Sequence, residues 1–201
     1  AKTPANKTLL RIPAFLLSFL IIAFASCQYL ASIFSERNDP TSLQRAVRLQ
    51  PSNAEYRYHL GLYSALLQPD LAASSLRAAV SLNPYDSRYW LALASAYNSL
   101  GNTQAEDAAL HKALQMGPTN PAIVWDAANV YFSAGETEQT LDLCHQLLAD
   151  QGPTFGHALP FCWKVKPDVD LFVSKLMPAR TDAYESFLDL LISSQQTAAT
   201  G

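Results

Sequence analysis

Hydrophobic and polar positions divide the chain into two parts. The stretch from Ile12 to Phe34 contains no charged side chain. Beyond Ser42, apolar residues recur at the three- and four-residue spacing of a helix, in segments separated by proline and glycine. This pattern predicts one long apolar helix followed by a series of shorter helices.

The apolar segment is long enough to cross a membrane. As a helix, the segment from Ile12 to Phe34 would extend roughly 34 Å, against a hydrocarbon core of about 30 Å. Lys2, Lys7 and Arg11 precede it, whereas the flank after it has no basic excess. By the positive-inside rule we expect a cytoplasmic N-terminus and everything after Ser35 outside the cytoplasm. The side chains expected to contact lipid, or one another in an assembly, are Ile12, Phe15, Leu20, Phe24, Tyr29 and Phe34.

Two other interpretations of this segment are a cleaved signal peptide and a lipoprotein signal. The apolar run exceeds the 7–15 residues, roughly, that are typical of signal peptides. Ala25, Ser26 and Cys27 resemble a lipoprotein processing site, but Phe24 fits its first position poorly. We therefore expect a retained single-span anchor, with lipidation of Cys27 left open.

A repeat governs the rest of the chain. Prolines at positions 51, 84, 118 and 153 follow one another at intervals of 33, 34 and 35 residues. A period near 34 is that of the tetratricopeptide repeat. The stretch that begins at Asn83 carries the associated residues at the associated offsets: Trp90, Leu93, Ala94, Tyr97, Gly101, Ala113 and Pro118. The chain thus resembles the tetratricopeptide repeat family.

The resemblance implies an all-α fold in which an N-terminal hydrophobic helix precedes a short solenoid of antiparallel helix pairs. We expect residues 1–35 to hold the basic flank and the apolar helix (12–34), 36–153 the solenoid, and 154–201 less regular helices that form a cap or a partial repeat. Within the solenoid we expect a half repeat at 42–51 and repeats at about 54–84, 87–118 and 121–153.

Two features of the repeat bear on packing. Small residues at Gly61, Ala94 and Ala128 would let the second helix of each pair approach the first. Glu106, Thr140 and Cys144 depart from the family's pattern, and Glu106 in particular raises the question of how tightly its helix packs.

In the tail we expect helices at 155–165, bent near Pro160, at 168–177, and at 181–194 with Thr181 as N-cap.

Composition narrows the class of protein. Only 15% of residues are charged, against about 25% in soluble domains, which agrees with a segment outside water. The net charge is -3 without a basic run, so nucleic acid is not an expected partner. The chain has three cysteines. Cys144 and Cys162 would pair only in an oxidising compartment; we favour two buried thiols and leave the pairing open.

Candidate chemistry is lacking. The four histidines lie at no known metal-ligand spacing from a carboxylate or cysteine: His59, His111, His145 and His157. The chain contains no HExxH, GxSxG, phosphate-loop or CxxCH motif. We therefore expect no enzyme activity, no metal and no cofactor.

The family resemblance instead implies a binding groove lined by the first helices. At its lining positions stand Tyr58, Leu62, Arg88, Leu91, Asn98, Trp125, Asn129 and Phe132. This set lacks the lysines that capture a terminal carboxylate and suits an apolar helix or extended segment. The alternative, to which we give equal weight, is that these residues pack against the chain's own tail.

The resulting hypothesis is a single-span protein of the bacterial cytoplasmic membrane, with a periplasmic or extracellular solenoid that holds other proteins. The alternative is a subunit that assembles with its own copies, for example into an extracellular filament with the apolar helices in its core. The sequence leaves the partner, the oligomeric state and the completeness of the chain open.

Overall fold

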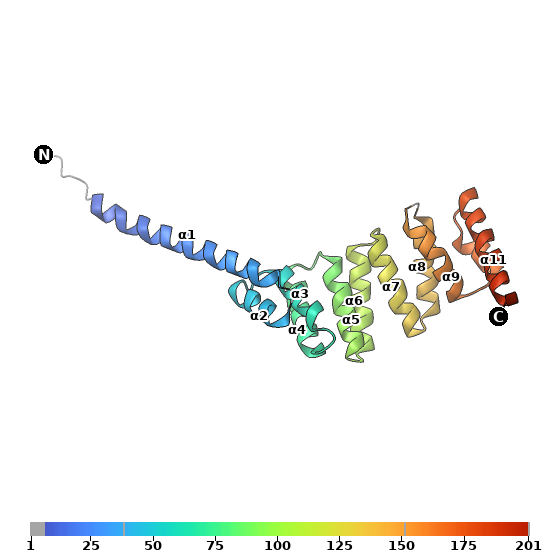
Figure 1. Cartoon of the computed structure of the whole chain (residues 1–201), viewed down its shortest axis with the longest axis horizontal. Coiled ribbons are helices and arrows are strands. Elements are labelled where there is room, and N and C mark those ends of the chain that lie inside the picture. Colours follow the sequence, from blue (N-terminus) through green and yellow to red (C-terminus); the bar gives the residue numbers. More distant parts are fainter. Residues whose placement is uncertain (1–6, 38, 151, 201) are drawn as a thin grey trace. The chain divides into compact units, whose positions relative to one another are not determined.

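The structure is a computed structural model that describes residues 7–37, 39–150 and 152–200, with side chains for 15–37, 39–150 and 152–194. These residues form helices and no strand, which confirms the expected all-α fold (Figure 1). The helices are α1 (Lys7–Ser35), α2 (Pro40–Leu49), α3 (Ala54–Ser64), α4 (Pro69–Leu82), α5 (Ser87–Ser99), α6 (Thr103–Met116), α7 (Pro121–Ala134), α8 (Thr137–Ala149), α9 (Thr154–Val165), α10 (Val169–Leu171), the π-helical segment η1 (Phe172–Leu176) and α11 (Thr181–Thr200).

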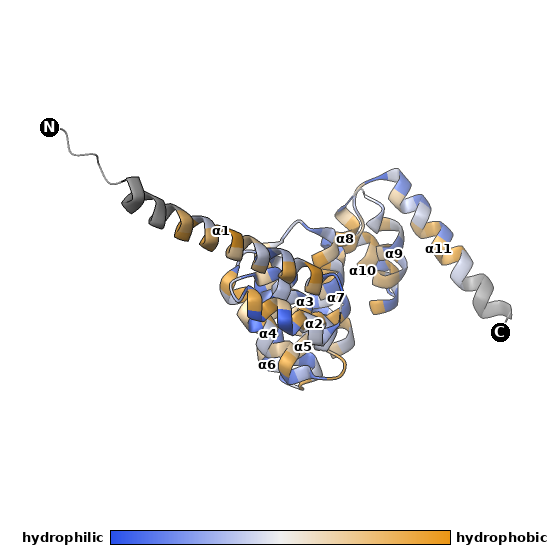
Figure 2. Cartoon of the chain, turned by 60° about the vertical axis from the view of Figure 1, so that its left-hand side comes forward, coloured by the Kyte–Doolittle hydropathy of each residue, from blue (hydrophilic) through white to orange (hydrophobic). Residues whose placement is uncertain are grey.

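Most of the described part of α1 has no covering. Phe15 is 75% exposed and Tyr29 is 68% exposed, whereas Ala31 is fully buried. Figure 2 shows apolar residues along the projecting part of the helix. The part from Phe15 to Ser35 is long and apolar enough to cross a membrane, a test that a signal sequence also passes. Ile12 belongs to α1, but its side chain lies outside the described residues.

The chain divides into two compact units. Unit 1 comprises residues 1–85 and 96–106, and unit 2 comprises residues 86–95 and 107–201. In unit 1, α1 packs on α2, α2 on α3, and α3 on α4. Phe34 lies in this packed part: it is half-buried, and the Arg45 guanidinium carbon is 5.7 Å from its ring centroid. Phe34 therefore differs from the exposed apolar residues with which the sequence grouped it.

Close approach of α3 and α4 depends on Gly61. Gly61 is buried, and a Cβ added there would overlap the side chain of Leu76, which α4 contributes to the core. Helix ends in both units use glycine where the backbone requires it: φ is 69° at Gly101 in unit 1 and 80° at Gly135 in unit 2. Only glycine adopts this left-handed conformation without strain, so both glycines stop the first helix of their pair.

The three departures from the repeat pattern are accommodated by polar or covalent bonds. Glu106 is buried and accepts a hydrogen bond of 2.8 Å from the Asn98 side-chain amide, so its helix packs despite the carboxylate. Thr140 is fully buried and donates its hydroxyl to the carbonyl of Glu136 at 2.8 Å. Cys144 is the third case.

A disulfide joins α8 to α9 in unit 2. It links Cys144 to Cys162, whose Cα atoms are 5.7 Å apart and whose side chains are fully buried. The favoured expectation of two unlinked thiols was therefore wrong: burial and pairing are compatible, because the two cysteines occupy facing helices. Cys27 is free and exposed.

The tail folds around three aromatic rings. The Phe172 and Phe187 rings stack with centroids 4.8 Å apart, and the Trp163 ring meets them edge-on at 5.5 and 5.4 Å. Helix α9 continues through Pro160, whose ring lies on the exposed side. The helix expected at 168–177 begins after an Asp168 N-cap and continues as the π-helix η1. Thr181 is the first residue of α11 and not its N-cap, because the Arg180 carbonyl already accepts from Tyr184 N–H.

We expect Gly61→Ala to destabilise unit 1. The added methyl group must displace the buried Leu76 side chain, and overpacking of this kind costs about 1–3 kcal/mol. Gly156→Ala in α9 is the matched control: a Cβ there meets nothing within 4 Å, and alanine is favoured over glycine in a helix by about 1 kcal/mol. Thermal unfolding followed by circular dichroism measures both. Equal melting temperatures for the two variants would contradict the close α3–α4 contact.

We expect loss of the disulfide to destabilise unit 2. The cysteines are 18 residues apart, and closing a loop of this length is worth about 3 kcal/mol. A Cys144→Ser, Cys162→Ser double variant should therefore melt well below the parent, while Cys27→Ser should not. Thiol titration of the unfolded, non-reduced protein should find one free thiol; three would contradict the bond.

Candidate partner-binding surface

The residues predicted to line a groove all lie on α3, α5 and α7. Tyr58, Leu62 and Asn98 belong to unit 1, and the other five belong to unit 2. Tyr58 is half-buried with its ring 5.4 Å from the His59 ring, and Leu62 is exposed. Leu91 is half-buried in α5.

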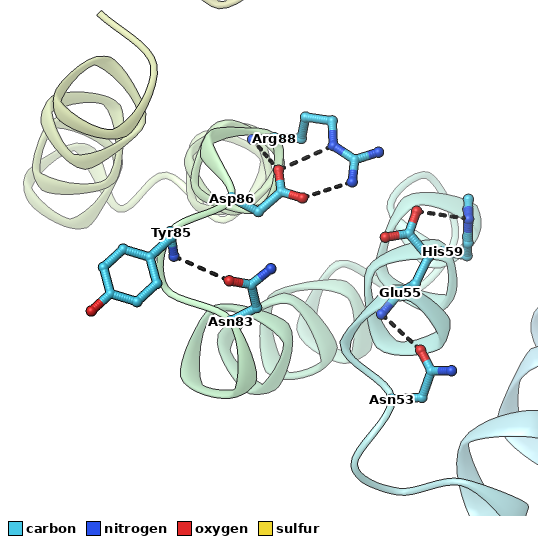
Figure 3. A network of polar contacts seen from close by, with 7 residues as sticks. All are labelled: Asn53, Glu55, His59, Asn83, Tyr85, Asp86 and Arg88. Atoms are coloured by element: carbon cyan, nitrogen blue, oxygen red, sulfur yellow. Dashed lines mark hydrogen bonds and ion pairs between the residues drawn. The ribbon is translucent and has the colours of Figure 1, made fainter.

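Arg88 is held by a neighbouring carboxylate. Its Nε donates to Asp86 Oδ1 at 3.0 Å and its Nη2 to Asp86 Oδ2 at 2.6 Å, as Figure 3 shows. The hydrogen bonds from the Arg88 side chain hold the pKa of Asp86 below its ordinary value, against the effect of burial. Arg88 therefore forms an ion pair within the chain at the start of α5.

The two asparagines of the predicted groove also bond within the chain. Asn98 donates to Glu106, and the Asn129 amide donates to the Trp125 carbonyl at 2.8 Å. Of the other polar contacts in Figure 3, one lies at the start of α3, where Asn53 accepts from Glu55 N–H at 3.0 Å, and one in the turn after α4, where Asn83 accepts from Tyr85 N–H at 3.3 Å. These side chains satisfy backbone donors that a helix start or turn leaves free. The arrangement does not favour capture of a terminal carboxylate.

Aromatic side chains of α7 meet the tail within unit 2. The Phe161 ring of α9 lies 5.1 Å from the Trp125 ring and 5.5 Å from the Phe132 ring, centroid to centroid. The Lys164 ammonium is 5.8 Å from the Phe132 centroid. One side of both rings is therefore covered by α9, as one of the two sequence interpretations expected.

A pocket remains open beside Trp125. It has a volume of about 380 Å³, and its walls are mostly apolar. The lining residues are Pro121, Ala122, Trp125, Pro153, Thr154 and His157. A pocket of this size admits an apolar side chain or a short segment of a partner. The sequence did not predict the second wall, which Pro153, Thr154 and His157 form, because residues after Pro153 no longer follow the repeat. The one available signal was Pro153 itself, which recurs at the repeat spacing.

The remaining titratable side chains in the described part of the chain form no cluster of the kind that catalysis uses. Among the residues whose side chains are described, no three His, Cys, Asp or Glu side chains gather as a metal site would require. His59 and His111 each lie one helical turn from a carboxylate, Glu55 at 3.4 Å and Asp107 at 3.8 Å. Burial raises the pKa of Asp126 on α7.

Comparison with known proteins yields likenesses of structure alone. No protein-family profile and no curated protein sequence matches the chain. Two crystal structures of MamA share 20% and 18% identity with it, with TM-scores of 0.57 and 0.58; they cover 80% and 88% of this chain and 89% and 94% of their own. Yeast Tom70 shares 19% identity at a TM-score of 0.55, over 86% of this chain and 40% of its own. These are tetratricopeptide repeat proteins. The chain has the tetratricopeptide repeat fold.

Because these solved structures share so little sequence with the chain, they establish its fold and leave its function to be argued from the surface. The expected solenoid class is thereby confirmed.

Asp86 Oδ1 also accepts from Arg88 N–H at 3.0 Å in the first turn of α5. We therefore expect Asp86→Ala to destabilise unit 2 by about 1 kcal/mol at neutral pH, the usual cost of losing an acceptor at a helix start. Since the folded-state pKa of Asp86 is lowered, its stabilisation is complete above the ordinary value of 3.8 and is lost as the pH falls through the folded-state pKa. The difference between variant and parent should therefore shrink in acid. Urea unfolding at several pH values measures it, and Asp189→Ala, at an exposed site within α11, is the control. A pH-independent difference would contradict the ion pair.

Proposed function

We propose that this protein is a non-enzymatic scaffold, anchored in a membrane through α1, that holds protein partners at the pocket between α7 and α9. The observation that carries the proposal is the open apolar pocket beside Trp125. Tryptophan in a partly covered apolar pocket is typical of the few residues that dominate binding at protein interfaces.

The exposed apolar surface of α1 supports the membrane part of the proposal. A helix that is apolar on all sides needs either lipid or other helices around it. Among the described residues, those from Phe15 to Leu30 are exposed within this chain. The basic residues before the segment favour a cytoplasmic N-terminus.

The disulfide supports a solenoid outside the cytoplasm. Bonds such as Cys144–Cys162 form and persist in oxidising compartments and are rare in the cytosol. This agrees with the orientation inferred from the basic flank, although the two arguments rest on different residues. Proteins of the same fold, such as those compared above, are typically non-enzymatic scaffolds.

The test is to fill the pocket without disturbing the core. Ala122 lines the pocket and is exposed, so Ala122→Glu places a charge in the mouth of the pocket while the fold persists. Ala134→Glu makes the same change at an exposed site at the far end of α7 and is the matched control. We expect Ala122→Glu to weaken partner capture by about 2 kcal/mol, or roughly thirtyfold, as for loss of a central interface contact.

The measurement is mass spectrometry of native particles extracted gently from membranes, followed by titration of the partner so identified. Capture that survives Ala122→Glu would contradict the pocket, and particles that contain this chain alone would contradict the scaffold.

A second candidate function is that of a self-assembling subunit, and one further observation favours it. Leu188 and Ile192, one turn apart on α11, are 57% and 55% exposed, so the last described helix also presents an apolar stripe. An exposed apolar stripe on a solenoid helix is suited to a heterologous contact that repeats. Sedimentation in detergent tests this candidate: a monomer at every concentration would exclude it.

A further inference from the structure

A side-chain hydrogen bond marks where α1 emerges from the packed part of unit 1. Gln28 in α1 and Gln50 at the end of α2 hydrogen-bond through their side chains. Ala31, one turn later, is fully buried, whereas the described residues from Phe15 to Leu30 are exposed. Helix α1 therefore meets unit 1 at Gln28, at the edge where α2 stops, and its outer side stays exposed as far as Leu30.

The apolar part of this free helix is shorter than a membrane is thick. The stretch 12–27, between Arg11 and Gln28, is uncharged throughout. As a helix it extends about 24 Å, against a hydrocarbon core of about 30 Å. The shortfall is about 6 Å, comparable to the headgroup layer on one side of the bilayer, which is about 5–8 Å thick.

A short span is accommodated by a thinner bilayer or by drawing flanking groups into the interface. The flank here is the edge of unit 1 at which α2 and α4 end and α3 begins, including the turns at 50–53 and 83–85, which we call the exit edge. The antiparallel order of α1 to α4, joined by short turns, places both turns at this edge.

The exit edge has the side chains of an interface. Tyr29 and Tyr85 are 68% and 80% exposed, and tyrosines of this kind are enriched at headgroup level. Arg48 is exposed in the last turn of α2, a helix without any acidic residue. Arg57 donates from Nε to the Pro51 carbonyl at 2.9 Å, which keeps its guanidinium at the edge.

Among the described residues of unit 1, one carboxylate lies at the same edge. Glu55 lies in the first turn of α3, and its Oε1 is 3.4 Å from Nε2 of His59, one turn further along that helix. Within unit 1, two guanidiniums thus accompany one carboxylate at the exit edge. A guanidinium binds a phosphate group with two parallel hydrogen bonds, so the edge suits phosphate oxygens at the depth where a bilayer presents them.

We propose that the exit edge of unit 1 lies within the headgroup layer on the solenoid side of the membrane, where Arg48 and Arg57 bind the phosphates of anionic lipids. This rests on the proposed function in one respect, the insertion of α1. It goes further in that the bilayer fixes the distance of unit 1 from the membrane surface, and lipid headgroups bind the protein in addition to its protein partners.

The experiment uses the full chain in vesicles, with a nitroxide probe at one position in a Cys27→Ser background. A probe at Leu20→Cys reports whether α1 is inserted, and a probe at Ser52→Cys, an exposed position of the exit edge, reports immersion of that edge. Collision rates with oxygen and with a water-soluble nickel complex give the depth of each probe. Vesicles are made of phosphatidylcholine alone or mixed with phosphatidylglycerol.

In the mixed vesicles we expect the Ser52 probe to be shielded from nickel. Arg48→Gln should lower the ratio of immersed to free edge about fivefold, the value of one basic residue near an anionic surface. Arg37→Gln removes the same charge from the exposed turn between α1 and α2, at the opposite edge of the unit, and should change nothing.

The outcomes separate the two proposals. A Leu20 probe that is accessible to nickel means that α1 is not inserted, which overturns the proposed anchor. An inserted Leu20 probe with a Ser52 probe that is fully accessible, or equally shielded in both vesicle types, or insensitive to Arg48→Gln, leaves the anchor standing and overturns the proposal for the exit edge.

Discussion

Burial of each helix's apolar face against the next helix along the chain is the interaction on which both units depend. In unit 1 this succession runs from α1 to α4, and in unit 2 from α7 through α8 to α9. No helix of the series forms a core alone, so each contact must be close. Gly61 shows the requirement most directly, because the space that its missing side chain leaves is filled by Leu76.

The periodic part of this architecture was predictable from sequence, because each repeat places proline, glycine and small residues at positions set by the backbone. Gly101 and Gly135 take the left-handed conformation that the pattern requires. Exceptions were less predictable. Glu106 and Thr140 are accommodated by partners on neighbouring turns or helices, and the Cys144–Cys162 bond depends on which helices face each other. Spacing along the chain does not contain that information.

The candidate pocket shows the same limit. Trp125 was identified from its place on the first helix of a repeat, but the opposite wall comes from Pro153, Thr154 and His157, where the pattern fades. Arg88 and Asn98 were identified as groove residues by the same rule, although bonds within the chain occupy them. The position of a residue in the repeat thus predicts the direction of its side chain better than whether that side chain is free to bind a partner. Whether it is free depends on bonds to neighbouring side chains, and the repeat pattern does not specify those side chains.

The disulfide has a mechanical consequence. When a chain is pulled from its two ends, a solenoid yields first at its termini, since each terminal helix is held by one neighbour only. Cys144 and Cys162 join the second helix of one pair to the first helix of the next. Tension from the C-terminal side therefore passes through a covalent bond from α9 to α8, and the stretch of chain between the cysteines carries none of it. Helix α9, which forms the second wall of the pocket beside Trp125, therefore stays attached to α8 under load.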